Sequence, residues 1–372
     1  MIGGKVAYMF GGMNRGGAET IMLDLFRNHR LASFPFIGIH RKGGSYRDAF
    51  YSAGPVLYQL TPGKFGYIRY LLKLRRLLRA ESITVVHTQH WLDCIYAWLA
   101  TIGLHVKLVN TFHGFYSMKG IAGWLCRMSI RMADDVCFVS KFEQEWYQKQ
   151  MRIADEKCHV IYNAVDFGKL DKVESRESRV DSGLKIEDRR LKNENLRLAM
   201  VGSFSPARNQ LLICKAIHEV EQKFEFYFIG APNEHISNCY RECYDYCKAN
   251  NLFDRVHFVG EQSNVYEWLK EMDGFVYATK HDTFGIAQVE AMAMGLPSIV
   301  SDWPVMKEIC APFIGKSVQL FSMDDENDCA QKMNNLLNHL KEYKNEAQKN
   351  ADEIKKMYSI EAYISRLLTI YN

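Results

Sequence analysis

Short apolar runs alternate with segments of helical periodicity along most of this 372-residue chain. Such alternation is typical of βαβ units, in which parallel strands form a sheet and the intervening helices cover it. In the first half, amphipathic helices are predicted over residues 18–28 and 67–79. The strands predicted in this half are residues 5–10, 36–40, 55–60, 83–88, 107–111, 136–140 and 159–162. We therefore expect an α/β fold.

A charged and polar segment, residues 167–195, interrupts this pattern. It contains few large apolar residues, which indicates an interdomain linker or an exposed loop with helix. A second α/β series follows, with strands predicted at 197–201, 225–229, 256–259, 274–278 and 298–300. The chain is long enough for two domains, each with its own core. The predicted division is residues 1–166, a linker at 167–195, a second domain at 196–357 and a final helix at 358–372.

Charge is divided unevenly between the two halves. Residues 1–166 hold 21 Lys/Arg and 12 Asp/Glu, a net charge of +9, and the remainder carries −5. A basic half predicts the kind of binding partner and says nothing about the fold. Anionic lipid or a lipid-linked phosphate would be attracted to it. The sequence shows no aromatic-basic nucleic-acid motif, and we expect no nucleic-acid partner.

One predicted helix concentrates this positive charge on a leucine-rich background. Its basic residues are Lys64, Arg69, Lys73, Arg75, Arg76 and Arg79. A helix of this kind can lie on an anionic membrane surface. Equally, it can cover a sheet and present a solvated basic face. Both interpretations stay open.

The N-terminal residues, the hydrophobic segments and the cysteines indicate the cellular compartment of the protein. Residues 1–10 resemble a strand and lack the long apolar region of a signal peptide. The most hydrophobic window, residues 91–104, is too short to span a bilayer. Ten cysteines show no paired zinc spacing, and Cys239, Cys243 and Cys247 would be strung along one helix face. We expect a reduced cytoplasmic protein, with peripheral attachment to the cytoplasmic face of the membrane left open.

The segment 282–297, DTFGIAQVEAMAMGLP, sets the carboxylates Asp282 and Glu290 eight positions apart. A helix is predicted to begin at residues 284–286 and to run to about Met294, where Gly295 and Pro297 stop it. The first N–H groups of a helix lack internal partners and carry a partial positive charge of about half a unit. An anion such as phosphate can bind there, close to a flexible glycine. The alternative is a capped surface helix with one buried, paired glutamate.

This segment resembles the signature of the family 4 retaining glycosyltransferases, which is Glu, seven residues, Glu, with Phe-Gly after the first Glu and Gly-x-Pro after the second. Asp282 stands in place of the first Glu. The resemblance continues in GGMNRGGAE (11–19), TFHG (111–114), VIYNAVD (160–166) and VGSFSPARN (201–209). The first of these also resembles members that act in bacterial cell-surface polysaccharide assembly.

The resemblance implies the GT-B fold, in which two Rossmann-like, doubly wound domains face each other across a cleft. The first domain would bind the acceptor and the second the nucleoside-diphosphate sugar, and the last helix would cross back to the first domain. Residues implied in donor binding are Gly16, Gly17, Ser203, Arg208, Phe284, Gly285, Ile286 and Glu290. Residues implied at the reacting centre are His113, Asp282 and Arg208.

Each implied role has a chemical reason. The departing diphosphate gains negative charge, so Arg208 and the helix N-terminus would stabilise it. Ser203 stands where the family often has a further basic residue. Glu290 would accept hydrogen bonds from the ribose hydroxyls, and Asp282 would contact the donor sugar. His113 would steady the reacting centre, while the leaving phosphate takes the proton of the acceptor.

Several residues have structural alternatives. Arg208 could be a surface loop residue and His113 a structural histidine, and for His87 and His90 the structural role is favoured. Asn163 and Asp166 would form the hinge turn. No Asp-x-Asp motif is placed to hold a metal on the diphosphate, so metal-independent transfer without a cofactor is expected.

The sequence thus predicts a retaining glycosyltransferase that moves a sugar from a nucleoside-diphosphate donor to a glycan or lipid-linked acceptor. The alternative is a catalytically silent GT-B protein that binds nucleotide or carbohydrate, and an epimerase of the same fold is a third reading. The donor sugar and nucleotide, the acceptor, the linkage and the oligomeric state are not indicated. Whether Asp282 alters donor choice is open too.

Overall fold

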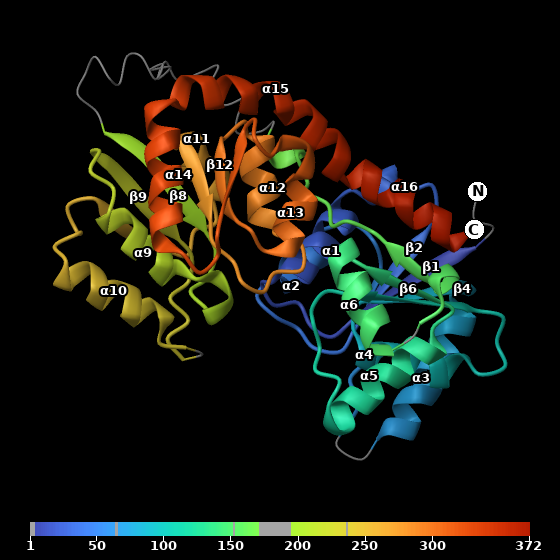
Figure 1. The fold of residues 1–372 in the computed structure, drawn as a ribbon. Coiled ribbons are helices and arrows are strands. Elements are labelled where there is room, and N and C mark those ends of the chain that lie inside the picture. Colours follow the sequence, from blue (N-terminus) through green and yellow to red (C-terminus); the bar gives the residue numbers. More distant parts are fainter. Residues whose placement is uncertain (1–3, 64–65, 152, 171–194, 236) are drawn as a thin grey trace. The chain divides into compact units, whose positions relative to one another are not determined.

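The computed structural model describes residues 4–63, 66–151, 153–170, 195–235 and 237–372. The chain forms two compact units, which we describe separately (Figure 1). Unit 1 comprises residues 1–165 together with 358–372, and unit 2 comprises residues 166–357. Most of the predicted linker, residues 171–194, lies outside the described residues.

Unit 1 is built on a seven-stranded parallel sheet in the order β3-β2-β1-β4-β5-β6-β7. Its strands are β1 Lys5–Phe10, β2 Phe36–His40, β3 Leu57–Gln59, β4 Ile83–Thr88, β5 Lys107–Phe112, β6 Asp135–Phe138 and β7 Cys158–Val160. Its α-helices are α1 Gly17–Arg27, α2 Arg47–Tyr51, α3 Tyr67–Ala80, α4 Trp91–Thr101, α5 Gly120–Met132, α6 Lys141–Met151 and α16 Ile360–Tyr371. Short 3₁₀ turns are η1 His29–Leu31 and η2 Asp155–Lys157.

Both faces of this sheet are covered, because successive side chains of a strand point to opposite faces. In β1, Ala7 and Met9 belong to the core formed with α3, α4 and α5. Tyr8 and Phe10 point the other way and pack against Phe26 of α1. The near-continuous apolar strands of the sequence follow from this two-sided burial.

The C-terminal helix α16 packs on the α1 side of the sheet. Its Tyr371 hydroxyl donates to the Tyr8 hydroxyl over 2.9 Å and contacts His87 Nδ1. His87 Nε2 lies 2.6 Å from Thr111 Oγ1. Tyr8 and His87 are fully buried and Tyr371 nearly so, hence this network anchors the end of the chain in unit 1.

Unit 2 contains a six-stranded parallel sheet in the order β10-β9-β8-β11-β12-β13. Its strands are β8 Leu196–Val201, β9 Phe224–Ile229, β10 Val256–Gly260, β11 Gly274–Tyr277, β12 Ser298–Ser301 and β13 Val318–Phe321. Its α-helices are α9 Gln210–His218, α10 Cys239–Ala249, α11 Val265–Lys270, α12 Ile286–Ala293, α13 Pro304–Cys310, α14 Glu326–Asn338 and α15 Leu340–Tyr358. The 3₁₀ turns are η3 Pro206–Arg208 and η4 Ala311–Phe313.

The two parallel α/β sheets confirm the predicted fold class. Each predicted strand has an observed counterpart whose ends differ by a few residues at most. The edge strand β13 was not predicted, because its VQLF run is short and carries little alternation. Within the described part of the chain, no helix has the length and apolarity needed to cross a membrane.

Candidate functional site

Two predicted site residues meet beyond the carboxyl-terminal edge of the unit 2 sheet. Arg208 ends η3, which follows β8, and Asp282 follows β11. Arg208 Nη1 donates to Asp282 Oδ2 over 2.6 Å. The two residues are 74 positions apart, yet β8 and β11 are neighbouring strands, so the sheet brings their loops together.

Tyr277, the last residue of β11, supports this ion pair. Its hydroxyl donates to the same Oδ2 of Asp282 over 2.6 Å. The guanidinium of Arg208 also lies over its ring, 5.2 Å from the centroid. Sequence reasoning missed this residue, although its place at the end of an apolar strand, five residues before Asp282, was a usable signal. The buried Tyr277 therefore orients both charged partners.

Backbone contacts hold the two loops against each other. Ala207 O accepts hydrogen bonds from Lys280 N at 2.8 Å and from Thr279 Oγ1 at 3.1 Å. On the other side, Trp303 Nε1 donates to Asp282 O over 2.8 Å. Two segments that are remote in sequence, at Ala207 and Trp303, thus hold the loop that carries the Asp282 carboxylate.

The N-terminus of α12 lies directly after Asp282. Gly285 has φ +85°, and its carbonyl accepts from Gln288 N and Val289 N, which closes the first turn. The N–H groups of Ile286 and Ala287, the first two residues of α12, have no acceptor within the helix. A Cβ added at Gly285 would lie 2.6 Å from Met306 Cε. Glycine is therefore favoured here by both backbone conformation and space.

The other residues predicted for donor binding in this segment lie on either side of Gly285 in the sequence. Phe284 is buried and Ile286, the first residue of α12, is half-buried. Glu290 lies one turn further along the helix, where Tyr266 of α11 donates its hydroxyl to Glu290 Oε1 over 2.7 Å. Tyr266 was not predicted. Its hydrogen bond holds the carboxylate of the half-buried Glu290 in place.

Ser203 lies in the exposed turn after β8. Its carbonyl accepts from Gln210 Nε2 over 3.0 Å, so its backbone is held by α9. The turn packs closely on the next strand, because a Cβ added at Gly230 would lie 2.1 Å from Gly202 O. Lys280, on the Asp282 loop, pairs with Asp324 at 2.6 Å. The loop that carries Asp282 therefore also carries a cation, Lys280. Position 203, where the family often has a basic residue, carries the neutral Ser203.

In unit 1, the glycine-rich turn after β1 leads into α1. Gly16 is the N-cap of α1 and Gly17 its first residue. A Cβ at Gly16 would lie 2.6 Å from Glu19 Oε2, so this carboxylate lies close against the turn. Burial raises the pKa of Glu19, which favours its protonated form.

His113 directly follows β5, and its Nε2 lies 2.7 Å from Gln89 Oε1. Burial is the main reason that its pKa is lowered to about 4, and the charge of nearby His90 adds to the effect. His113 is therefore neutral at pH 7 and acts through hydrogen bonding rather than as a cation. Gln89, which orients the ring, was not predicted.

The remaining predicted histidines have structural contacts. His87 belongs to the buried network with Tyr371, and His90 caps α4 by accepting from Leu92 N over 3.1 Å. At the predicted hinge, Asn163 is buried and Asp166 accepts from Gly168 N. These contacts agree with the structural role favoured for the two histidines.

Among the described residues, no three His, Cys, Asp or Glu side chains group as a metal site would require. The cysteines Cys243 and Cys247 are buried along one face of α10, beside Cys214 of α9. Metal-independent activity stays a prediction that chelation can test.

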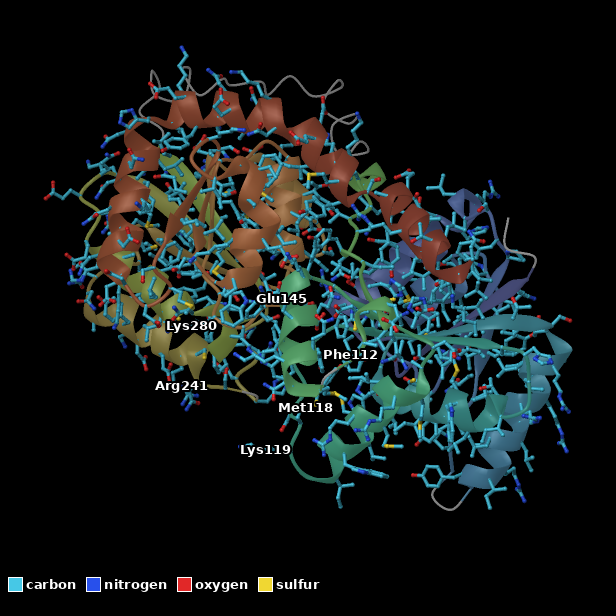
Figure 2. All side chains as sticks on the ribbon, turned by 45° about the vertical axis from the view of Figure 1, so that its right-hand side comes forward. Phe112, Met118, Lys119, Glu145, Arg241 and Lys280 are labelled. Carbon is cyan, nitrogen blue, oxygen red and sulfur yellow. The ribbon has the colours of Figure 1, made fainter. Side chains whose placement is uncertain are left out.

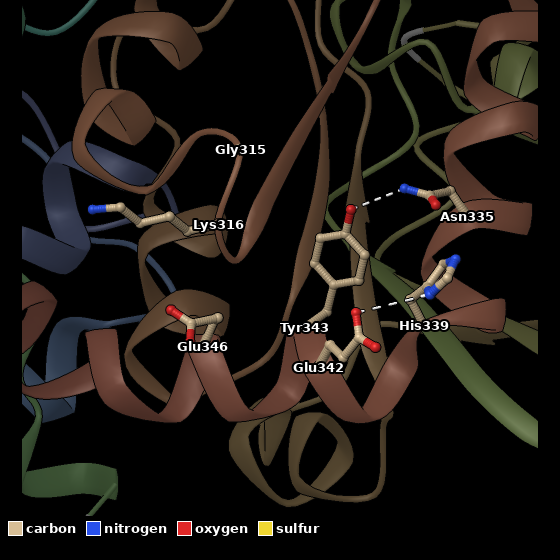
Figure 3. A pocket seen from close by; sticks show the side chains of 7 residues that line it. All are labelled: Gly315, Lys316, Asn335, His339, Glu342, Tyr343 and Glu346. Atoms are coloured by element: carbon tan, nitrogen blue, oxygen red, sulfur yellow. Dashed lines mark hydrogen bonds and ion pairs between the residues drawn. The ribbon is translucent and has the colours of Figure 1, made fainter.

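A pocket of about 450 Å³ lies elsewhere in unit 2 (Figure 3). Its lining residues are Gly315, Lys316, Asn335, His339, Glu342, Tyr343 and Glu346. Asn335 Nδ2 donates to the Tyr343 hydroxyl over 2.9 Å. The loop before β13 and the end of α14 lie at the amino-terminal edge of the sheet, the opposite edge from Arg208 and Asp282. This pocket is thus separate from the predicted site.

Two family models match the chain. "Glycosyltransferase Family 4" matches residues 15–169, and "Glycosyl transferases group 1" matches residues 195–339. The protein named "Putative glycosyltransferase EpsF" of Bacillus subtilis (strain 168) is 22% identical over 80% of this chain and 79% of its own. The GDP-mannose:cellobiosyl-diphosphopolyprenol alpha-mannosyltransferase of Xanthomonas campestris is 26% identical over 78% of this chain and 76% of its own.

A solved structure shares the fold over the whole chain. Alr3699/HepE of Anabaena, crystallised with UDP and glucose, superposes with a TM-score of 0.80 at 15% identity. The match covers 99% of each chain.

Proposed function

The chain belongs to the family 4 glycosyltransferases of the GT-B fold, and on this premise we propose that it performs a retaining sugar transfer. The donor is a nucleoside-diphosphate sugar and the acceptor is a glycan or a lipid-linked glycan. The pathway is bacterial cell-surface polysaccharide assembly. A glycosyltransferase is an enzyme that needs a donor site, and unit 2 supplies the chemistry for one.

A single observation carries the proposal. At one edge of the unit 2 sheet, the cation Arg208, the N-terminus of α12 and the carboxylates Asp282 and Glu290 converge. Cations and N–H dipoles match a diphosphate, and carboxylates match sugar hydroxyls. Only Nη1 of Arg208 is engaged by Asp282, so the rest of the guanidinium fork can bind phosphate.

The proposed roles follow from these contacts. Arg208 and the first N–H groups of α12, at Ile286 and Ala287, stabilise the negative charge that grows on the leaving diphosphate. Glu290 accepts from the ribose hydroxyls, and Asp282 contacts the donor sugar. The turn at Gly16 and Gly17 of unit 1 also faces the donor phosphates in this proposal.

His113 has a supporting role at the reacting centre. Because it is neutral at pH 7, its ring can accept or donate a hydrogen bond without placing a second cation near the sugar. The leaving phosphate then takes the proton of the acceptor hydroxyl as the new glycosidic bond forms. Positive charge comes from Arg208 and helix dipoles, so no metal is required.

The acceptor is the least constrained partner. Residues 1–166 carry a net charge of +9, which favours an acceptor that bears phosphate, such as a lipid-linked glycan. The name of the Xanthomonas relative includes a diphosphopolyprenol acceptor, which supports the same class. The proposed location is the cytoplasm, at the cytoplasmic face of the membrane.

A catalytically silent GT-B protein is the second candidate. It is favoured by one observation, that Asp282 replaces the usual Glu and is already held by Arg208 and Tyr277. Such a protein would bind donor nucleotide without turnover.

Incubation of purified protein with UDP-, GDP- and dTDP-sugars and lipid-linked acceptors tests both candidates. Transfer or slow donor hydrolysis supports the enzyme, and NMR of the product must show the anomeric configuration of the donor. An inverted product contradicts the retaining mechanism. Nucleotide binding without turnover of any donor supports the silent protein.

A further inference from the structure

The exposed apolar residues of unit 1 gather on one helical layer. Among the described residues of this unit, ten large hydrophobic side chains are exposed, and seven of them lie on or directly after α3, α4 and α5. These seven are Tyr67, Ile68, Leu72, Leu99, Ile102, Ile121 and Trp124. In the described part of unit 2, only Tyr244 and Phe253 are comparably exposed. A concentration of this kind marks an interaction surface rather than ordinary exposure.

The same layer is almost free of negative charge. No Asp or Glu occurs between Asp48 and Glu81 or between Asp93 and Asp134, so α3 and α5 contain none. Asp93, the single acidic residue of α4, is fully buried and pairs with Arg41 at 2.6 Å. The solvent therefore meets only apolar, neutral and basic groups on this layer.

Apolar and basic side chains alternate on the outer face of α3. Ile68 and Leu72 are exposed in line with each other, one turn apart. The exposed basic residues beside them are Arg69, Lys73, Arg76 and Arg79. Arg75 differs, because it donates to the carbonyls of Ala100 and Ile102 at the end of α4. The basic face predicted from sequence is thus exposed in part, and Lys64 lies outside the described residues.

Helix α5 contributes Ile121, the most exposed apolar residue of this layer, together with Trp124. Ile121 is 80% exposed and Trp124 is 53% exposed, both in the first two turns. Lys119 lies at the outer end of the loop that leads into this helix (Figure 2). Trp and Lys or Arg together are typical of the membrane–water interface.

Contacts between neighbouring elements join the three helices of this layer. Helix α4 packs against both α3 and α5. Tyr67 of α3 stacks on Tyr96 of α4, and His90 before α4 contacts Tyr116 before α5. Since α3 and α5 follow strand ends, their N-termini lie at the carboxyl-terminal edge of the sheet, where His113 lies.

We propose that this layer docks the protein on an anionic bilayer. The docking face consists of Tyr67, Ile68, Leu72, Ile121 and Trp124 with Arg69, Lys73, Arg76, Arg79 and Lys119. The apolar side chains enter the headgroup region, and the basic ones pair with anionic lipid. Since the N-terminal ends of α3 and α5 lie at the same sheet edge as His113, docking of this face brings His113 near the membrane, where a lipid-linked acceptor would be reached.

Charge argues for lipid as the occupant. A second copy of the chain seated on the same face would oppose basic groups to basic groups, because the face offers no acidic partner. An anionic headgroup layer neutralises all of them. The proposal does not depend on sugar transfer, since vesicle binding is measured without a donor.

The test is co-sedimentation of the full chain with vesicles of phosphatidylcholine alone or mixed equally with phosphatidylglycerol, at low and high salt. We expect binding to anionic vesicles at low salt that weakens as salt rises. R69E/K73E/R76E/R79E should lower the partition coefficient at least about a hundredfold. I121Q/W124Q should lower it at least about tenfold at both salt concentrations, because apolar insertion is not screened.

A matched control separates the face from net charge. R241E/K248E/K349E/K356E makes the same change in charge on exposed residues of unit 2, and it should leave most binding intact. Equal partitioning to neutral and anionic vesicles, or an equal loss in the control, overturns the proposal. A dimer in light scattering that I121Q/W124Q dissociates would instead assign the face to a second copy. Donor hydrolysis by these variants should be unchanged, so failure here is distinguishable from failure of the proposed function.

Discussion

At the scale of single residues, the proposed donor site consists of side chains that hold one another in place. Arg208 and Asp282 pair at 2.6 Å, and Tyr266 holds Glu290 at 2.7 Å. Preorganised groups cost less to order when a ligand arrives. The ion pair is partly exposed and contributes little to folding. Its value is therefore expected in activity rather than in stability.

Arg208→Ala and Glu290→Ala should each lower kcat/KM by at least roughly tenfold. A hydrogen bond to a charged group contributes about 1.5–3 kcal/mol, and each variant loses at least one. Both side chains are only partly buried, so thermal unfolding should stay near that of the wild type. Arg241→Ala, which removes an exposed arginine of α10, is the control. Unchanged kinetics in both site variants would contradict the donor-site assignment.

Tyr277→Phe tests the residue that positions the ion pair. The ring keeps its stacking on Phe275 at 6.0 Å, and only the hydroxyl bonded to Asp282 is lost. We expect kcat to fall about fivefold, the effect of about 1 kcal/mol, with little change in KM. Asp282→Glu, which restores the usual family residue, should be tolerated or should shift donor preference. A Tyr277→Phe enzyme with wild-type kcat would show that Asp282 needs no such support.

At the scale of elements, the left-handed backbone of Gly285 lies at the N-terminus of α12, where we propose that the donor diphosphate binds. Gly285→Ala should weaken donor binding, because a residue other than glycine is strained at φ +85° and its Cβ displaces Met306. The strain is about 1–2 kcal/mol. Gly295→Ala, at φ +72° beyond the other end of α12, carries similar strain away from the donor. Calorimetric titration with nucleotide should distinguish them, with equal affinities counting against the anion site.

The helix N-terminus also bears on metal dependence. If its N–H groups and Arg208 neutralise the diphosphate, transfer should survive saturating EDTA with a rate unchanged within a factor of about two. Activity that chelation abolishes and magnesium or manganese restores would assign the cationic role to a metal instead.

At the scale of the whole molecule, the last residues of the chain, 358–372, belong to the same unit as residues 1–165. Helix α16 belongs to unit 1 although α15 before it belongs to unit 2. The buried contact of Tyr371 with His87 and Tyr8 secures this return. Unit 1 therefore completes its fold only when the last residues are in place.

This anchor should make stability fall in mild acid. Burial lowers the pKa of His87 to about 3, whereas an unfolded histidine titrates near 6.5. Below pH 6.5 the unfolded chain binds a proton that the folded chain rejects, so stability decreases as the pH falls. His87 alone should cost about 2 kcal/mol between pH 7 and pH 5.

Chemical unfolding at the two pH values measures this loss. His87→Gln should reduce the difference, and NMR titration of the histidine ring protons gives the answer if that variant does not fold. A His87 resonance that titrates near pH 6.5 in the folded protein would refute the prediction.

Local patterns predicted most of the strands and several helices. Apolar alternation predicted the strands, and Gly295 marked the end of α12, because such preferences act within a few residues of sequence. The segment DTFGIAQVE likewise indicated a helix N-terminus between two carboxylates, and α12 begins where it was expected. Strand β13 was not predicted, because its four residues VQLF are too few to show a clear alternation of apolar and polar side chains.

The sequence by itself determined the fold class, the family and which residue types would be available for chemistry, because these depend on short-range periodicity and motif spacing. Only the tertiary structure decided which side chains meet. Arg208 reaches Asp282 across 74 residues because β8 pairs with β11. Tyr266 and Gln89 become hydrogen-bond partners of Glu290 and His113 only in the folded chain. Ile68 and Trp124 likewise lie on one helical layer because of the tertiary structure. Helices distant in sequence become neighbours only when the strands between them are ordered into a sheet.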